Sequence, residues 1–209
     1  MSDAIDTLPI ELVVRGRRAI VIGASGECVS KVERLALAGA DVRVFPEGEP
    51  IDPKVAALAS AGEVSIEQRA FDVRDAEGAA VIFVSPSMEA LGAELAAEAR
   101  TRGTLVSTLD RPESCTFINP AVARGAGLRV AISSGGAAPA LVRALRVELE
   151  RVLDDPKLAR FVAELGARRA ALPRGARGAA MNALLEGFEA HLRVVFPAWF
   201  EGRDHDARG

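Results

Sequence analysis

Several residues that stabilise or drive chemistry in small proteins are scarce in this sequence. Its 209 residues include no tyrosine, one tryptophan, two histidines and two cysteines. Cys28 and Cys115 cannot form a disulfide framework. Neither these cysteines nor His191 and His205 have the spacing of a metal site. We therefore expect no dedicated protein metal site.

Long apolar runs and a strong charge of either sign are also missing. No run approaches the roughly 20 apolar residues of a membrane span, and residues 1–18 lack the basic and apolar regions of a signal peptide. A formal net charge of -3 gives no reason to expect nucleic acid or an anionic membrane as a partner. These features predict a cytoplasmic protein that binds neither.

The first half of the chain alternates apolar strands with helices. Apolar periodicity predicts strands at 19–22, 41–45, 64–66, 81–84 and 105–109, and helices at 29–38, 54–61 and 88–102. Strands and helices of these lengths in alternation predict a parallel sheet with right-handed crossovers. We therefore expect residues 1–112 to form an α/β domain with a doubly wound parallel sheet.

The second half has a different pattern. A loop-rich stretch at 112–120 precedes a predicted strand at 128–132 and a long amphipathic helix at 139–153. The remainder is rich in Ala and Arg and is predicted to be mostly helical, with breaks at 173–175 and 196–197, and the tail from Gly202 is predicted to be disordered. We expect a small α+β segment at 113–150 and a helical C-terminal domain at 151–209.

The stretch VIGASGECVSK, residues 21–31, has the pattern of a dinucleotide-binding turn with one glycine missing. Gly23 can make the tight turn after the first strand, and Cys28 is small enough for the helix to pack closely on the strand. Ser25 stands where the backbone should approach a pyrophosphate, although Gly26 behind it could restore the room. The acid that binds the ribose should end the second strand, but Phe45 stands there.

Glu47, two residues after Phe45, is the candidate substitute for that acid. On the residues alone, two interpretations of the stretch 21–31 remain open. It is either a cofactor-binding turn or a tight strand-to-helix turn that binds nothing.

Asp110 lies at the predicted carboxyl end of a strand, where open α/β sheets bind their ligands. Aspartates in loops are also commonly solvated or cap a turn. The neighbouring Arg111 and Glu113 fit either interpretation, so the role of Asp110 stays open on this ground.

The run Ser133-Ser134-Gly135-Gly136 lies between a predicted strand and a helix that begins near Pro139. A glycine turn before a helix start can bind an anion through backbone amides, but it can equally be a helix cap made by a serine. Further along, Arg143 and Arg146 share one face of the helix. They either bind carboxylates or are solvated.

Three stretches in the same order resemble one known family. They are LPIELVVRGRRAIVIG at 8–23, STLDRPESCTFINPA at 107–121 and LRVAISSGGAAPALVRALRVELE at 128–150. Together they resemble the N-terminal module of siroheme synthase, whose members are precorrin-2 dehydrogenases and in part also sirohydrochlorin ferrochelatases. The specific parts are SSGG-x-x-P and the D-x-P before F-I-x-P-A. The resemblance runs over about residues 8–153 and is loose beyond.

The resemblance implies a Rossmann-like NAD-binding domain, a dimerisation segment at 113–150 and a helical C-terminal domain, in a homodimer. It implies a tetrapyrrole, precorrin-2 or sirohydrochlorin, in a crevice between domains, with Fe(II) or Co(II) as the substrate metal. It implies that Asp110 is the general acid/base of both reactions. It also places Ser134 at a turn where some members carry a phosphorylatable serine. The residues expected to bind the cofactor are Gly23, Ala24, Ser25, Gly26, Glu27, Glu47, Gly48 and Ser85, and those expected to bind substrate are Ser133, Ser134, Gly135, Gly136 and Arg143.

Three departures from the family pattern fall on the cofactor side. Gly23-Ala24-Ser25 replaces G-G-G or G-x-G, VSPSM at 84–88 replaces an A-T-D/N-D/N motif, and STLD at 107–110 replaces N-V-V-D. Asp110 and the stretch 133–139 keep the pattern. We therefore expect weakened NAD binding, with tetrapyrrole binding or metal insertion better preserved. The alternatives are a chelatase that has lost its dehydrogenase step and a non-catalytic protein that binds a tetrapyrrole or a nucleotide.

Overall fold

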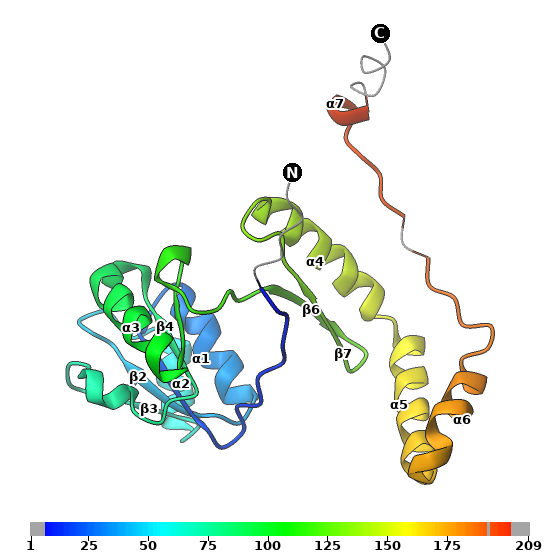
Figure 1. Cartoon of the computed structure of the whole chain (residues 1–209), viewed down its shortest axis with the longest axis horizontal. Coiled ribbons are helices and arrows are strands. Elements are labelled where there is room, and N and C mark those ends of the chain that lie inside the picture. The colour runs from blue at the N-terminus through cyan, green and yellow to red at the C-terminus, as the bar shows by residue number, and fades with distance from the viewer. Residues whose placement is uncertain (1–6, 192, 202–209) are drawn as a thin grey trace. The chain divides into compact units, whose positions relative to one another are not determined.

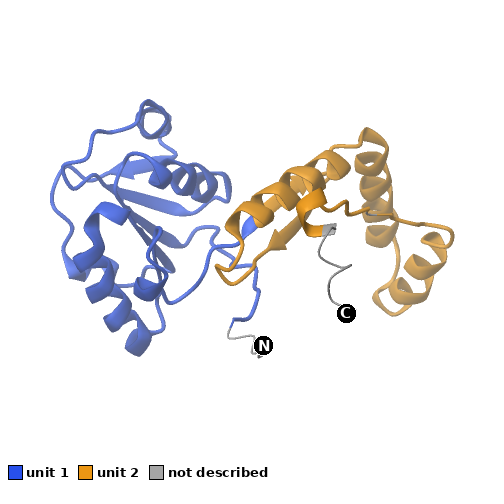
Figure 2. Ribbon diagram, turned by 90° about the horizontal axis from the view of Figure 1, so that it is seen from above, with its two compact units in different colours: residues 1–121 blue, residues 122–209 orange. Residues whose placement is uncertain are grey.

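The computed structural model describes residues 7–191 and 193–201 (Figure 1). The chain divides into two compact units, Met1–Ala121 and Val122–Gly209, which Figure 2 draws in blue and orange. The predicted disordered tail from Gly202 onward lies outside the described residues.

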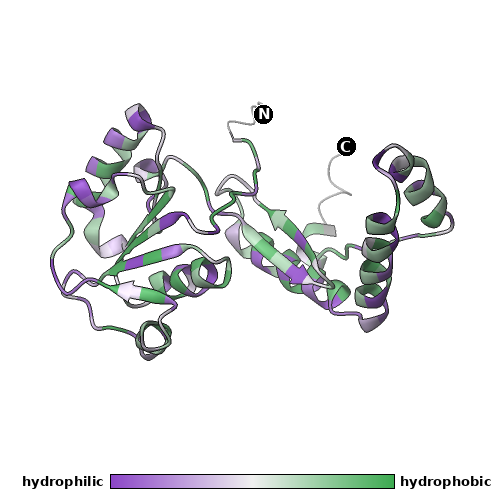
Figure 3. Cartoon of the chain, turned by 90° about the horizontal axis from the view of Figure 1, so that it is seen from below, coloured by the Kyte–Doolittle hydropathy of each residue, from purple (hydrophilic) through white to green (hydrophobic). Residues whose placement is uncertain are grey.

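A five-stranded parallel sheet forms the centre of the first unit. Its strands are β1 (Arg18–Ile22), β2 (Asp41–Phe45), β3 (Val64–Ile66), β4 (Val81–Val84) and β5 (Leu105–Thr108), in the order β3-β2-β1-β4-β5. All four neighbouring pairs are parallel. The strands are mostly hydrophobic (Figure 3) because helices cover both faces of the sheet. The predicted Rossmann-like α/β fold is confirmed.

Alternate residues of each strand enter two separate cores. On one face, Val21 and Val44 pack with Val32 of α1 (Glu27–Leu37) and Val55 of α2 (Pro53–Ser60). On the other, the strands pack against α3 (Glu89–Arg102) through Leu95 and its neighbours. Short 3-10 turns lie at Val73–Ala76, Pro86–Met88 and Pro112–Ser114. The strands of the sheet thus contribute to the hydrophobic cores on both of its faces.

The strand order reverses between β1 and β4. From β1 the chain crosses by α1 to β2, whereas from β4 it crosses by α3 to β5 on the opposite side of the sheet. Loops after two such strands diverge and leave a crevice at their carboxyl ends, which is where open α/β sheets bind ligands. A ligand site is therefore expected at the turns after β1 and β4.

The second unit contains a β-hairpin and helices. β6 (Ala121–Gly125) pairs with β7 (Leu128–Ile132), and α4 (Pro139–Leu153), α5 (Pro156–Ala171), α6 (Arg177–Leu184) and the short α7 (Ala198–Glu201) follow, with a 3-10 turn at Arg174–Ala176. β6 is missing from the sequence-based expectation. The described residues from 188 to 197 are not helical, unlike the mostly helical remainder that was expected.

α4 packs closely on the hairpin at Gly125. A Cβ at this position would come within 2.6 Å of the backbone oxygen of Leu153, so only glycine fits. Within the second unit, Ala123 and Leu153 are the buried hydrophobic residues of the described part, and the residues of β7 are exposed except for a half-buried Ile132. In the described residues, none of the helices is long and apolar enough to cross a bilayer.

Candidate functional site at the carboxyl edge of the sheet

The turn after β1 requires glycine at its first position. Gly23 has a φ of +118°, and a Cβ there would lie 2.8 Å from the Cβ of Ser85 and 2.9 Å from Sγ of Cys28. Its amide donates to the carbonyl of Phe45, 2.8 Å away. The turn after β1 is thus packed directly against the ends of β2 and β4, and Gly23 makes the tight turn that a nucleotide-binding loop requires at this position.

The rest of the turn leads into α1. Ala24 is fully buried, and Gly26 is the residue before α1, with a φ of 54° and open space around its missing Cβ. Glu27 begins the helix and is exposed. Ser25, the residue in place of the missing glycine, is half-buried and directs its hydroxyl to a carboxylate from another loop.

That carboxylate belongs to Glu49, which lies in the loop between β2 and α2. One oxygen, Oε2, accepts hydrogen bonds from the amide of Ala24 at 3.1 Å and the hydroxyl of Ser25 at 2.8 Å. The other, Oε1, accepts from the hydroxyls of Ser85 at 2.6 Å and Ser87 at 2.9 Å. A single carboxylate therefore joins the turn after β1 to the turn after β4, across the point where the strand order reverses.

These contacts keep Glu49 ionised and affect its neighbour Cys28. Burial raises the pKa of Glu49, but the hydrogen bonds from Ser85, Ser25, Ser87 and Ala24 together outweigh it and place the pKa below its ordinary value. Burial, and next the charge of Glu49, raise the pKa of the Cys28 thiol to about 11. At neutral pH the crevice therefore holds a carboxylate beside a neutral thiol.

Sequence reasoning missed Glu49. It considered Glu47 because an acid is expected close to the end of β2, whereas Glu49 comes four residues after that end. A loop side chain that reaches back over β1 leaves no periodic signal. The only hint in the sequence is a second acid in the run Glu47-Gly48-Glu49.

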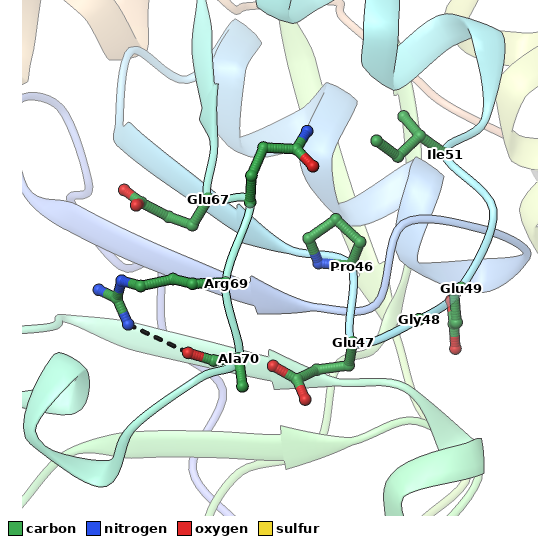
Figure 4. A pocket seen from close by; sticks show the side chains of 9 residues that line it. Pro46, Glu47, Gly48, Glu49, Ile51, Glu67, Arg69 and Ala70 are labelled. Carbon is green, nitrogen blue, oxygen red and sulfur yellow. Dashed lines mark hydrogen bonds between the residues drawn. The ribbon is translucent and has the colours of Figure 1, made fainter.

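Glu47 and Gly48 line a pocket beside this loop (Figure 4). The pocket measures about 440 Å³ and lies between residues 46–51 and 67–70, at the carboxyl ends of β2 and β3. Glu47 has a φ of 51° and Gly48 one of 80°. The Glu47 carboxylate accepts a hydrogen bond from the amide of Phe71, so this acid holds the two walls of the pocket together.

Phe45, which stands where a ribose-binding acid is expected, is a core residue. Its ring is fully buried and packs edge-on against Phe71, with ring centroids 5.2 Å apart. The guanidinium of Arg69 lies 5.2 Å from the Phe45 ring centre and binds both carboxylate oxygens of Asp75 at 2.7 Å. The end of β2 is therefore closed by aromatic packing rather than by an acid.

Asp110 lies in the turn directly after β5 and is exposed. Its φ of 58° is left-handed, a conformation that few residues other than glycine adopt without cost. The flanking residues hold this turn in place. The amide of Leu109 donates to the carbonyl of Val84, and the guanidinium of Arg111 pairs with the carboxylate of Glu89 at 3.2 Å. The structure thus places the Asp110 carboxylate at the same edge of the sheet as the turns after β1 and β4.

Lys31 of α1 is a second residue that sequence reasoning did not single out. Its ammonium lies over the ring of Phe83, 5.7 Å from the ring centre. Burial and the charge of Arg34 lower the pKa of Lys31, while nearby acidic groups, Asp110 among them, counteract this. The ammonium and the Asp110 carboxylate therefore attract each other across this edge.

The serine–glycine run 133–136 belongs to the second unit, in the turn between β7 and α4. Ser133 Oγ accepts from the amide of Gly135 at 3.2 Å, and Ser134 Oγ accepts from the amide of Ala138 at 2.9 Å. Gly135 and Gly136 have φ values of 61° and 88°. Both hydroxyls thus hold the backbone of this turn, but neither caps α4, because the N-cap residue is Ala138 and no described side chain caps the helix. The anion-binding role stays a prediction.

The two arginines that follow on α4 differ in their surroundings. Arg143 is exposed, and Arg146 is half-buried and pairs with Glu150 at 2.5 Å. Among the described residues, no group of three or more His, Cys, Asp or Glu could hold a metal ion.

The parallel sheet and the glycine turn after β1 define a Rossmann-like α/β protein, and the comparisons with known proteins agree. A family model described as "Putative NAD(P)-binding" matches residues 10–121. The siroheme synthase of Methylococcus capsulatus is 34% identical over 206 residues, which cover 97% of this chain and 42% of that protein. That of Pseudomonas entomophila is 37% identical over 146 residues, or 69% of this chain and 31% of that protein.

The chain therefore belongs to the family of the siroheme synthase N-terminal module. It spans less than half the length of the curated relatives it matches. A solved structure titled "SirC, precorrin-2 dehydrogenase" matches with a TM-score of 0.70, covering 87% of this chain and 90% of that one. Its sequence is 15% identical, so this likeness shows the shared fold.

Proposed function

We propose that this chain is a siroheme-biosynthesis enzyme that oxidises precorrin-2 to sirohydrochlorin with NAD. The observation that carries the proposal is the arrangement of three turns along one edge of the sheet. The glycine turn after β1 and the serines after β4 donate to the carboxylate of Glu49, and Asp110 follows β5. A dinucleotide site beside an acid/base group is what this oxidation requires.

The residues at the edge fit the diphosphate of NAD. A Cβ at Gly23 would have no room. The donors after β1 and β4 already bind the two carboxylate oxygens of Glu49. The amide of Ala24 and the hydroxyls of Ser25 and Ser85 are the groups that would hold the phosphates. Gly26 and Glu27 lie beside them at the start of α1, and Glu47 and Gly48 line the adjoining pocket. When bound, NAD supplies the acceptor for the hydride removed from the macrocycle.

Asp110 is suited to take the accompanying proton. Oxidation of precorrin-2 removes one hydride and one proton, and a carboxylate at the crevice edge can accept that proton. Insertion of Fe(II) or Co(II) as a substrate metal would release two pyrrole N–H protons, which the same carboxylate can accept one after the other and pass to water. One residue could therefore serve both the dehydrogenase and the chelatase reactions.

The tetrapyrrole and the oligomeric state are part of the same proposal. The substrate is a polycarboxylate, so Arg143 and the amides of the turn 133–136 have an electrostatic use. The exposed apolar residues of β7, Leu128 and Val130, support a homodimer formed through this segment, because exposed apolar residues that lie together on a folded surface are typical of an interface.

Asp110→Asn tests the assignment of the acid/base. Asparagine tolerates a left-handed φ better than most residues, so the turn is kept while the carboxylate is lost. We expect the rate of NAD-dependent precorrin-2 oxidation, followed by absorbance, to fall by about 100-fold or more. The matched control is Asp41→Asn at the amino end of β2, on the opposite edge of the sheet, which should keep the wild-type rate. An unchanged rate in Asp110→Asn would show that another group takes the proton.

A chelatase without the dehydrogenase step is the second candidate function. The observation in its favour is the Glu49 carboxylate, which is bound where a cofactor phosphate would lie. Metal insertion into sirohydrochlorin without any NAD-dependent oxidation would establish it. A protein that binds the tetrapyrrole but performs neither reaction would be a non-catalytic binding protein.

A further inference from the structure

The strongest feature that the proposed function leaves unexplained is the position of the Glu49 carboxylate. Its partners are one backbone amide and three hydroxyls, contributed by the turns after β1 and β4. All four are neutral donors that converge on the two oxygens of one anion. We call this set of donors, from Ala24, Ser25, Ser85 and Ser87, the anion seat.

The anion seat explains two of the three departures that distinguish the cofactor side of this sequence. Ser25 stands where related sequences are expected to have glycine, and Ser85 and Ser87 lie in the stretch that replaces the expected A-T-D/N-D/N motif. All three place their hydroxyls on the carboxylate of Glu49, at 2.6 to 2.9 Å. Changes that look independent along the chain therefore act together on one side chain.

The geometry points to a role for Glu49 in setting cofactor affinity. We propose that its carboxylate occupies the anion seat in the free protein and that the phosphates of a dinucleotide bind by displacing it. The proposal rests on the proposed function in so far as the ligand is a dinucleotide. Because neutral donors hold Glu49, its charge is not neutralised in the seat. An incoming diphosphate therefore meets both competition for the donors and repulsion.

Displacement of Glu49 does not require the sheet to move. Two backbone hydrogen bonds hold the loop that carries Glu49. The amide of Glu49 donates to the carbonyl of Pro46 at 2.9 Å, and the amide of Asp52 donates to the carbonyl of Ala24 at 2.9 Å. Glu49 is half-buried, and Gly48 beside it is exposed. Rotation about the side-chain bonds of Glu49 is enough to free the donors.

The test measures binding of NAD, ADP and adenosine by titration calorimetry to the wild type, Glu49→Gln and Glu49→Ala. We expect both variants to bind NAD and ADP with a Kd lower by about tenfold, because one unit charge near the phosphates is removed. Adenosine has no phosphate, so its Kd should not change. The matched control is Glu63→Gln, which removes the same charge from an exposed turn before β3 and should bind all three ligands like the wild type.

The outcomes separate this inference from the proposed function. Unchanged or weaker binding of NAD and ADP by both Glu49 variants would overturn it, and weaker binding would identify Glu49 as an acceptor for the ribose hydroxyls. Failure of every variant to bind NAD and ADP would overturn it as well. Tighter ADP binding without any precorrin-2 oxidation would support the inference while the proposed function fails.

Discussion

At the scale of single residues, the stability contributed by Glu49 should depend on pH. Its pKa in the folded protein lies below the ordinary 4.5, because hydrogen bonds favour the charged form. The contribution is therefore complete above about pH 4.5 and is lost as the pH falls through the folded-state value. We expect Glu49→Gln to unfold a few degrees below the wild type near neutral pH, a loss of about 1 kcal/mol. That difference should shrink in thermal scans at progressively lower pH.

Glu63→Gln serves as the control for this experiment too, since it changes the same charge outside the anion seat. Its melting temperature should follow that of the wild type throughout the pH range. A difference between Glu49→Gln and the wild type that stays constant until the protein unfolds in acid would mean that the ionised carboxylate does not contribute through its hydrogen bonds.

The residues of the edge also show what could be predicted from the sequence. The positions of Gly23 and Asp110 follow from the rule that ligands bind at the carboxyl ends of parallel strands, and the structure places both residues at that edge. Ser25 and Ser85 were recognisable as unusual residues. Their common partner was not, because Glu49 reaches them from a loop whose path depends on tertiary packing.

At the scale of elements, the parallel sheet was predictable and the hairpin of the second unit was not. The five strands of the sheet are short apolar runs separated by helices, and this alternation is a strong signal. β6 reads AVARG, with a single buried residue, Ala123, and follows directly after Pro120. Such a strand has neither clear alternation nor an apolar run, and it is defined only by pairing with β7.

The contact between the hairpin and α4 gives a prediction at this scale. A methyl group at Gly125 would press against the backbone oxygen of Leu153 at 2.6 Å, and backbone cannot yield as a flexible side chain does. We expect Gly125→Ala to destabilise the second unit by about 1–3 kcal/mol. Denaturant unfolding followed by circular dichroism measures this loss. NAD binding to the first unit should be retained.

Gly166 provides a matched control with the opposite expected sign. It lies inside α5 and has open space around its missing Cβ, so Gly166→Ala should stabilise the helix by about 0.5–1 kcal/mol. Equal stability of Gly125→Ala and the wild type would show that α4 can shift away from the hairpin without cost.

At the scale of the whole molecule, the two units differ in how much core they contain. The first has two apolar layers around its sheet, whereas the buried hydrophobic residues described in the second are Ala123 and Leu153. The exposed apolar side chains of the second unit include Leu128 and Val130 on β7 and Leu141 on α4, which has an exposed fraction of 58%. A surface of this kind on a folded chain is typical of a protein interface, which is why we expect a second copy to cover it.

Substitution on β7 tests that expectation. Analytical ultracentrifugation of the wild type should show a dimer at micromolar concentration, and Val130→Lys should shift it to monomer, because a lysine buried in an apolar interface has no partner. Leu37→Lys, which alters a residue that is 85% exposed on α1 of the first unit, should leave the dimer intact. A monomeric wild type, or a Val130→Lys variant that stays dimeric with unchanged circular dichroism, would exclude β7 as the interface.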